Sequence, residues 1–224
     1  MYALVEDNTI TKTYNNPRGM TIGGIQYPQN IHSLWPEADL NAIGIYTVVY
    51  DDTNKKAEEW YINTNQTLAF AGGVVTATYG TATARAIADT LYTQADVDAD
   101  VYPNDYYIVS KRGERIHIFA KDDIKIKGLK TVKKEIFDRQ AAGMLSKYDW
   151  YIIRNTEAET AIPSAITDYR TAVRAKCNSM QAQVDGAANI DALAALYAYV
   201  NTGTEENPVM ERPLGEWPTD PNAE

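Results

Sequence analysis

The sequence predicts an α+β protein: a small antiparallel β-sheet domain with one or two short helices, then a helical hairpin and an extended tail. Through the first half, short β-branched and aromatic runs alternate with turn residues, as in strands and hairpins. From about Leu129, apolar residues recur at steps of three and four, the period of a helix. After Asn201, Pro, Glu, Gly and Asn dominate without any period. We therefore place a β-rich domain at 1–126, a helical domain at 127–200 and an extended or disordered tail at 201–224.

Three hairpins are predicted in the β-rich domain, each from two β-prone runs around turn residues. Glu6-Asp7-Asn8 separates the first pair of runs. Gly72-Gly73 separates the second, and a Gly-Gly pair can take the positive φ angles of a tight hairpin turn. The paired runs are residues 2–5 with 9–14, 68–71 with 74–79, and 106–110 with 115–119.

Two short helices and one further strand complete this domain. Pro36 at a helix start, acidic residues in the first turn and Gly44 at the end predict a single helix between them. The β-branched and aromatic run at 45–50 predicts a strand directly after it. Residues 83–92 have helical composition, so we expect a second short helix there.

Two amphipathic helices are predicted in the second domain. The later one opens at Pro163, where a missing backbone N–H does no harm, and Gly186 is its expected stop. Asn189 is expected to cap a short final helix that runs through Ala198. The apolar stripes are Leu129, Val132, Ile136, Ala141 and Leu145 in the earlier helix, and Ile166, Tyr169, Val173, Cys177, Met180 and Val184 in the later one.

Charge and cysteine content exclude several classes of function. The formal net charge of -9, from 21 basic and 30 acidic residues, opposes a phosphate backbone, so we expect no nucleic-acid partner. Cys177 is the only cysteine, which rules out an internal disulfide and a Cys-rich zinc site. Its place on an apolar stripe predicts a buried structural thiol. No run approaches the roughly 20 apolar residues of a membrane helix, so we expect no membrane insertion.

Residues typical of catalysis are sparse. His32 lies in a Pro-rich loop and His117 in a predicted strand, and no nucleophile elbow, HExxH helix or phosphate-binding loop is present. We therefore expect no catalytic residues, no cofactor and no enzymatic activity.

One acidic segment resembles the start of a calcium loop. Asp96, Asp98 and Asp100 alternate as its first ligands would. Val101 stands where the sharp turn needs Gly, and Tyr107 where the bidentate Glu belongs. We therefore expect a solvated acidic turn and no metal.

A block of the helical domain combines several elements in a fixed order. A helix that ends in a leucine precedes an Asp-Trp turn, an Arg-containing segment, a Pro-initiated helix, and a Tyr-Arg pair with Arg four residues later. The residues are Arg139, Gln140, Leu145, Tyr148, Asp149, Trp150, Arg154, Ile162, Pro163, Tyr169, Arg170 and Arg174. The block resembles phage tail assembly chaperone-like domains. The runs PEADLNAIGIYTVVYDD and YGTATARAIADTL resemble the N-terminal β-region of tail and tail-fibre proteins of marine phages.

Physical chemistry gives the block a structural interpretation. Asp149 is expected to cap a helix whose first turn holds Trp150, with that ring packed in the groove between the flanking helices. Arg154, Arg170 and Arg174 are expected to pair with Asp149, Glu157 or Asp168. These residues would hold a helical hairpin together, and the alternative is a direct role in partner binding.

The resemblance implies a structural component of a phage virion, in the tail, baseplate or tail fibre. Such a protein is made in the host cytoplasm and works as a homo-oligomer in contact with other tail proteins. The alternative is a tail or tail-fibre assembly chaperone that is absent from the mature particle. A third hypothesis is a carbohydrate-binding module for host attachment, with Trp35 and Trp60 as stacking platforms.

Four apolar residues interrupt the polar tail. They are candidates for docking on a neighbouring chain as an extended segment, in competition with the usual disorder of chain ends. They are Val209, Met210, Leu214 and Trp217.

Overall fold

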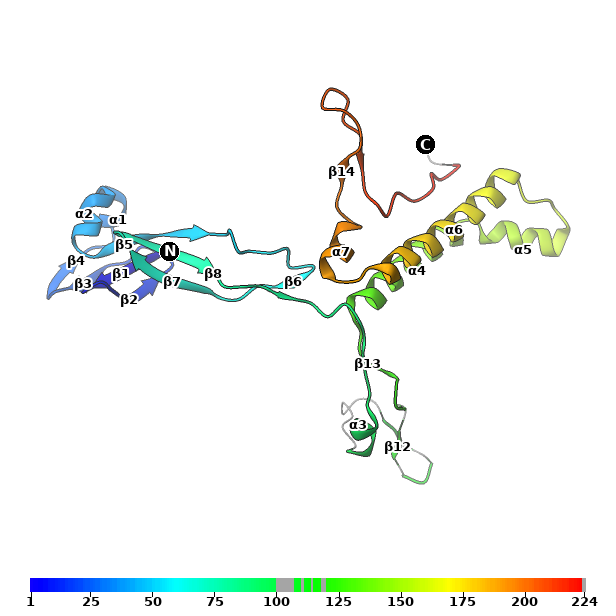
Figure 1. Cartoon of the computed structure of the whole chain (residues 1–224), viewed down its shortest axis with the longest axis horizontal. Helices are drawn as coiled ribbons and strands as arrows, with labels where there is room; N and C mark the ends of the chain where they lie inside the picture. The colour runs from blue at the N-terminus through cyan, green and yellow to red at the C-terminus, as the bar shows by residue number, and fades with distance from the viewer. Residues whose placement is uncertain (100–106, 110, 114, 118–119, 223–224) are drawn as a thin grey trace. The chain divides into compact units, whose positions relative to one another are not determined.

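The computed structural model contains two compact units, Met1–Ala84 and Arg85–Glu224, which are described separately (Figure 1). It describes residues 1–99, 107–109, 111–113, 115–117 and 120–222, without the side chains of 107–109 and 115–117. Strands with short helices come first and longer helices follow, so the predicted α+β class is confirmed.

Unit 1 is built on a five-stranded sheet of order β2-β1-β5-β8-β7 (Figure 1). All neighbouring strands are antiparallel except β5 and β8, which run parallel, so the prediction of a purely antiparallel sheet is wrong. The β7–β8 hairpin inserts its second strand next to β5, and β8 then takes the same direction as β5. The strands are β1 (Tyr2–Glu6), β2 (Thr9–Tyr14), β5 (Ile45–Asp51), β7 (Gln66–Ala71) and β8 (Val74–Tyr79).

Two tight turns shape this sheet as predicted. Asp7 and Asn8 have φ angles of 49° and 61° between β1 and β2, and Gly72 and Gly73 have 59° and 79° between β7 and β8. Positive φ at both central residues is the signature of the type I′ turn, whose twist matches that of the flanking strands. Both hairpin predictions are confirmed.

Strand β1 carries buried residues toward both faces of the sheet. Ala3 and Val5 pack in one cluster with Val48, Val75 and Ala77. The intervening Leu4 packs in a second cluster with Ile31, Leu40 and Ile45, which come from α1 (Ile31–Leu34), α2 (Glu37–Ala42) and β5. The helix predicted after Pro36 is confirmed as α2. His32 belongs to α1 and not to a loop, because the backbone turns at Asn30.

Short ribbons complete unit 1. Strands β3 (Met20–Ile22) and β4 (Ile25–Tyr27) pair with each other, as do β6 (Tyr61–Ile62) and β9 (Thr83–Ala84). The helix predicted at 83–92 is wrong, because β9 and β10 (Thr90–Leu91) occupy that segment. Between them, the carbonyls of Ala86 and Ile87 accept the first amide hydrogens of α4 (Leu129–Ser146) and are unavailable for a helix of their own.

The boundary between the units lies near residue 85, not near the expected residue 127. The N–H of Gly128 donates to Asp89 Oδ1 at 2.6 Å, and the N–H of Leu129 donates to the Ala86 carbonyl at 2.9 Å. Strand β10 also pairs with β13 (Ile124–Ile126). These bonds tie the segment before residue 127 to the helices that follow it.

Unit 2 contains the predicted helical hairpin, formed by α4 and α6, which lie side by side (Figure 1). The predicted stripe of α6 is buried throughout. On α4 the buried residues are Lys133, Phe137 and Ala141, so only Ala141 of the predicted stripe is fully buried. The reason is that Tyr197 stacks on Phe137 at 6.4 Å and lies 4.8 Å from the Lys133 ammonium. The helices are α4 (Leu129–Ser146), α5 (Asp149–Ala158), α6 (Ser164–Gly186) and α7 (Ile190–Ala195).

The smaller elements of unit 2 match the sequence-based predictions in part. Strands β11 (Tyr107–Val109) and β12 (Arg115–His117) pair as predicted. Asn189 caps α7 by accepting from the Ala192 N–H at 2.9 Å, although this helix ends earlier than expected. Strands β14 (Val200–Asn201) and β15 (Met210–Glu211) form a further ribbon. Within the described residues, no helix is both long and apolar enough to cross a membrane.

Candidate protein interaction surfaces

The junction between α4, α5 and α6 is held by Arg170. This side chain is 8% exposed, and its Nη1 donates to the Leu145 carbonyl at 2.7 Å and to Asp149 Oδ1 at 2.8 Å. The predicted Arg170–Asp149 pair is therefore confirmed. The predicted helix cap is wrong: Asp149 is the first residue of α5, no side chain caps that helix, and the carboxylate faces the guanidinium instead.

Two tyrosines reinforce this junction. Tyr148 and Tyr169 are buried and meet edge to face, with ring centroids 5.6 Å apart. The Tyr148 hydroxyl donates to Asp220, and this bond to a carboxylate raises the pKa of Tyr148. Burial raises the pKa of Tyr169. Both hydroxyls therefore stay protonated through the neutral range and remain hydrogen-bond donors.

The outer face of α5 is apolar and exposed. No residue of this helix is buried, and Trp150 and Ile153 are 49% and 56% exposed. The expectation that Trp150 packs between the flanking helices is wrong, because the Arg170–Asp149 pair fixes α5 with that ring turned outward. We use the name α5 surface for the exposed side chains of Trp150, Ile152 and Ile153 together with the half-buried Tyr151 and Arg154, which stack with Trp150.

Stacking fixes the rings of the α5 surface. The Trp150 and Tyr151 ring centroids are 3.8 Å apart, and the Arg154 guanidinium lies 4.7 Å and 5.1 Å from them. The predicted carboxylate partner of Arg154 is thus replaced by two aromatic rings. Its Nε is shielded from solvent and has no hydrogen-bond partner among the described residues. Fixed rings lose little conformational freedom on binding, which favours their use in an interface.

Two further residues of the block, Pro163 and Arg174, stabilise α6 locally. The Pro163 carbonyl accepts from the Ile166 N–H at 3.0 Å, so the helix begins where predicted. Arg174 Nη1 donates to the Arg170 carbonyl at 3.4 Å, one turn back on the same helix, and this bond takes the place of the expected carboxylate pair.

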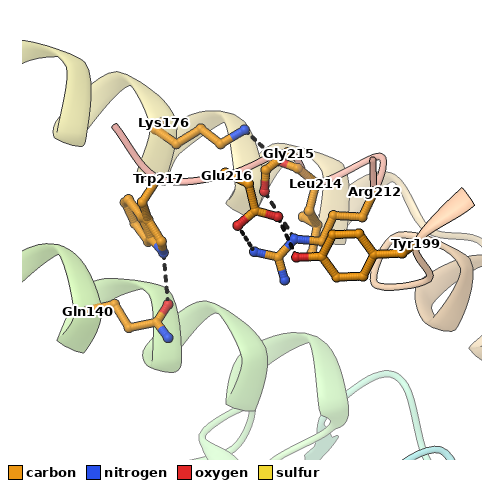
Figure 2. A network of polar contacts seen from close by, with 8 residues as sticks. All are labelled: Gln140, Lys176, Tyr199, Arg212, Leu214, Gly215, Glu216 and Trp217. Carbon is orange, nitrogen blue, oxygen red and sulfur yellow. Dashed lines mark hydrogen bonds and ion pairs between the residues drawn. The ribbon is translucent and has the colours of Figure 1, made fainter. Parts of the chain in front are cut away.

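Residues 212–220, which we call the C-terminal strap, dock on the helices of their own chain. Leu214 is 1% exposed, and its N–H donates to the Leu196 carbonyl at 3.1 Å. Lys176 of α6 donates to the Leu214 carbonyl, as Figure 2 shows. Of the two states expected for the tail, extended or disordered, this segment takes the extended one, because the buried Leu214 side chain and two hydrogen bonds of the Leu214 backbone fix it to α6 and to the end of α7.

The strap then continues to α4. The Trp217 indole N–H donates to Gln140 Oε1 at 3.2 Å (Figure 2). Further along, Asp220 accepts from the Tyr148 hydroxyl and forms an ion pair with Lys147 at 3.3 Å. Bonds to the Tyr148 hydroxyl, to the Asn222 N–H and to Lys147 lower the pKa of Asp220.

A second polar cluster holds the start of the strap. Glu216 accepts from the Tyr199 hydroxyl at 2.6 Å and from Arg212 Nη2 at 2.9 Å (Figure 2). The Tyr199 hydroxyl and the Arg212 guanidinium lower the pKa of Glu216, and the carboxylate in turn raises the pKa of Tyr199. Arg212 also donates from Nε to the Gly215 carbonyl at 3.1 Å, which closes the turn.

The four tail residues expected to dock on a neighbour thus separate into two pairs. Leu214 and Trp217 dock on their own helices, whereas Val209 and Met210 are exposed at the β14–β15 ribbon. The contacts that Lys176, Gln140 and Asp220 make in docking the strap were not predicted, because isolated polar residues carry no periodic signal. In the sequence, docking of this segment is indicated by Leu214 and Trp217, two isolated apolar residues within a polar run.

The third function hypothesis loses one of its two platforms. Trp60 is 7% exposed and so cannot offer a stacking face to a sugar, because its ring belongs to the core of unit 1. Trp35 is more exposed and lies edge-on to Tyr27, with centroids 5.9 Å apart.

Asp96 and Cys177, which the sequence offered as candidates for metal binding and thiol chemistry, have structural roles. Thr93 caps α3 (Gln94–Asp98), and Asp96 completes the capping box by accepting from the Thr93 N–H at 2.9 Å; Asp96 also pairs with Lys125 at 2.7 Å. Asp100, the third residue of the calcium-loop pattern, lies outside the described residues, as does the His117 side chain. Among the described residues, no cluster of three His, Cys, Asp or Glu side chains could hold a metal ion. The Cys177 thiol is buried as predicted, and burial together with Asp138 raises its pKa.

Comparisons with family models, with curated proteins and with solved structures found no match to this chain.

Proposed function

We propose that this protein is a structural component of a bacteriophage tail, baseplate or tail fibre, and that it acts through protein contacts, not through chemistry on a substrate. The observation that carries the proposal is the α5 surface. A helix that buries none of its own residues, yet holds Trp150 and Ile153 outward, gains stability when a partner covers it.

Physical magnitudes support a partner for α5. An isolated helix of its length is marginal in water, so its stability depends on tertiary contacts. Among the described residues, Arg170 binds the first turn of this helix through Asp149. Burial of apolar area contributes about 25 cal/mol per Å², so a partner that covers two or three large side chains would add several kcal/mol before the cost of association.

The phage assignment rests on the resemblance of the block that runs from Arg139 to Arg174. One feature of its geometry supports reading the block as a single structural unit. Residues 21 and 25 positions apart meet at Arg170: the carboxylate of Asp149 and the carbonyl of Leu145. The spacing of these elements brings Arg170, Asp149 and Leu145 into contact, and this contact orients α5, the helix that carries Trp150.

Quantitative mass spectrometry of purified, DNA-filled particles of the source phage, alongside the lysate, tests this function. We expect a copy number per particle that is a small integer multiple of the tail symmetry. Abundance in the lysate with none in particles would contradict the virion role and support the assembly chaperone. Native mass spectrometry of the isolated chain tests the accompanying proposal of a homo-oligomer.

A further inference from the structure

Unit 1 contains a cavity of about 360 Å³ between β2 and β3 that carries two cations. Its apolar lining comes from Leu4, Tyr14 and Met20, of which the first two are buried. Lys12, Arg18 and Thr21 are exposed residues of the same lining. A hollow of this size with an apolar floor and a few convergent polar groups is the usual form of a small-ligand site.

The charge of this cavity is unusual for the chain. The protein has a formal net charge of -9, yet none of the residues that line the cavity is acidic. Among the described residues, neither Lys12 nor Arg18 forms a side-chain hydrogen bond or an ion pair. The two cations therefore attract an anion from solution.

Two contacts prepare the site for such an anion. The Arg18 guanidinium lies 5.1 Å from the centre of the Tyr14 ring, and this stacking orients the planar group while its N–H donors stay available. The Tyr14 hydroxyl lies 3.7 Å from the Met20 sulfur, which is a weak hydrogen-bond acceptor. A carboxylate oxygen in its place would accept a stronger hydrogen bond from this hydroxyl. Burial raises the pKa of Tyr14 to about 12, so the hydroxyl remains a donor.

We propose that this cavity binds a carboxylate group carried on a small, partly apolar body. Arg18 and Lys12 would bind the carboxylate, and the Tyr14 hydroxyl would donate to it, while carbon atoms of the ligand cover Leu4 and Met20. A dianionic phosphate lacks the apolar body that this floor would cover. The site lies in unit 1 and does not depend on the α5 surface, so its failure would leave the proposed function intact.

Titration of the ¹⁵N-labelled full chain at low salt, followed by NMR, tests the proposal with two carboxylate probes. N-acetylneuraminate stands for an acidic sugar, and N-acetyl-glutamate amide stands for an acidic side chain of a protein. We expect saturable shifts of backbone amides in residues 12–21 with at least one probe. Response to the sugar alone assigns a glycan source, response to the amino acid alone a protein source, and response to both assigns recognition to the carboxylate itself.

Matched variants decide whether the cations bind the probe. Arg18→Gln and Lys12→Gln should each weaken binding at least fivefold. Tyr14→Phe should weaken it about twofold to tenfold while keeping the ring under Arg18. Lys55→Gln, which removes an exposed cation stacked on Tyr79 elsewhere in unit 1, should change nothing. Unchanged thermal transitions establish that each variant is folded.

Three results would overturn the proposal. The first is an equal response to the neutral N-acetyl-glutamine amide, which would show that the carboxylate is not recognised. The second is an equal or stronger response of the same amides to inorganic phosphate. The third is binding that Arg18→Gln and Lys12→Gln leave unchanged, or no binding of either probe at millimolar concentration.

Discussion

Arg170 and Asp149 form a 2.8 Å ion pair that ties the first turn of α5 to the end of the α4–α6 hairpin where α4 ends and α6 begins. The same guanidinium nitrogen donates to the Leu145 carbonyl, so one buried side chain satisfies the end of one helix and orients the start of the next. The orientation of Trp150 on the outside follows from this pair.

Arg170→Ala should lower the free energy of unfolding by about 2 to 4 kcal/mol, because it removes a buried donor from both the Leu145 carbonyl and the Asp149 carboxylate. Urea denaturation followed by circular dichroism measures the change. Arg139→Ala, at an exposed position on α4, is the matched control and should stay within about 0.5 kcal/mol of the natural chain. Equal effects of the two substitutions would show that the junction contributes nothing specific.

Trp150→Ser should weaken partner binding and leave the fold in place. The exposed ring contributes a stack with Tyr151 and Arg154, whose loss costs at most about 1 kcal/mol. Incorporation of the variant into particles, measured relative to the natural chain in the same infection, should fall severalfold. Leu34→Ser, which removes a side chain that is 71% exposed on α1, should be incorporated normally. Normal incorporation of Trp150→Ser would remove the α5 surface from the interface.

Leu214→Ala should detach the C-terminal strap and destabilise unit 2 by about 2 to 4 kcal/mol, the usual cost of truncating a fully buried leucine. Limited proteolysis should then cleave the chain near residues 212–220 well before the helices. Met210→Ala, 55% exposed, should leave both the proteolysis rate and the stability unchanged. Protection of the strap in Leu214→Ala would mean that its polar contacts suffice.

Acidification should release the strap. The pKa values of Asp220 and Glu216 are lowered from ordinary values of 3.8 and 4.5 by hydroxyl and cation partners. A lowered folded-state pKa means that the stabilisation is complete above the ordinary value and is lost as the pH falls through the folded-state value. The indole N–H signal of Trp217 should therefore shift toward its free position below about pH 4. In Asp220→Asn, the part of this pH-dependent shift of the Trp217 signal that comes from Asp220 should be missing. A Trp217 signal in the natural chain that is unchanged at pH 2.5 would show that the two carboxylates do not hold the strap.

Two glycines should respond to alanine in opposite directions. A Cβ at Gly128 would lie 2.3 Å from the Ala88 carbonyl atoms, so Gly128→Ala must displace the chain that holds the start of α4. We expect a loss of more than about 2 kcal/mol of stability. Gly143 lies inside α4, where an added Cβ would meet no atom within 4 Å, and Gly143→Ala should raise the stability by up to about 1 kcal/mol. Thermal unfolding of the two variants side by side tests both signs.

Local patterns predicted the elements whose own residues decide their structure. The α6 stripe from Ile166 to Val184 is one example, since a period near 3.6 already names the buried face. The turn at Gly72-Gly73 is another, because few other residues accept two consecutive positive φ angles. In both cases the determining information lies within a few residues.

The errors concern features decided by distant residues. Residues 83–92 have helical composition, but the carbonyls of Ala86 and Ile87 are taken by the amides of Leu129 and Lys130. The direction of β8 depends on which strand it joins, and the position of Trp150 depends on Arg170, which lies in the next helix along the chain. The strap is fixed by single contacts such as Leu214 with Leu196, which leave no period in the sequence.

Because the C-terminal strap is translated late, unit 1 and unit 2 can complete their folding at different times during synthesis. Every strand of the five-stranded sheet in unit 1 has been translated by Tyr79, so that sheet can close while the ribosome is still making α4. The α4–α6 pair receives Leu214, Trp217 and Asp220 more than 25 residues after Gly186. The α4–α6 hairpin therefore stays without its strap until those three residues have been made and docked, and until then a chaperone or a second copy has access to the surface that the strap later covers.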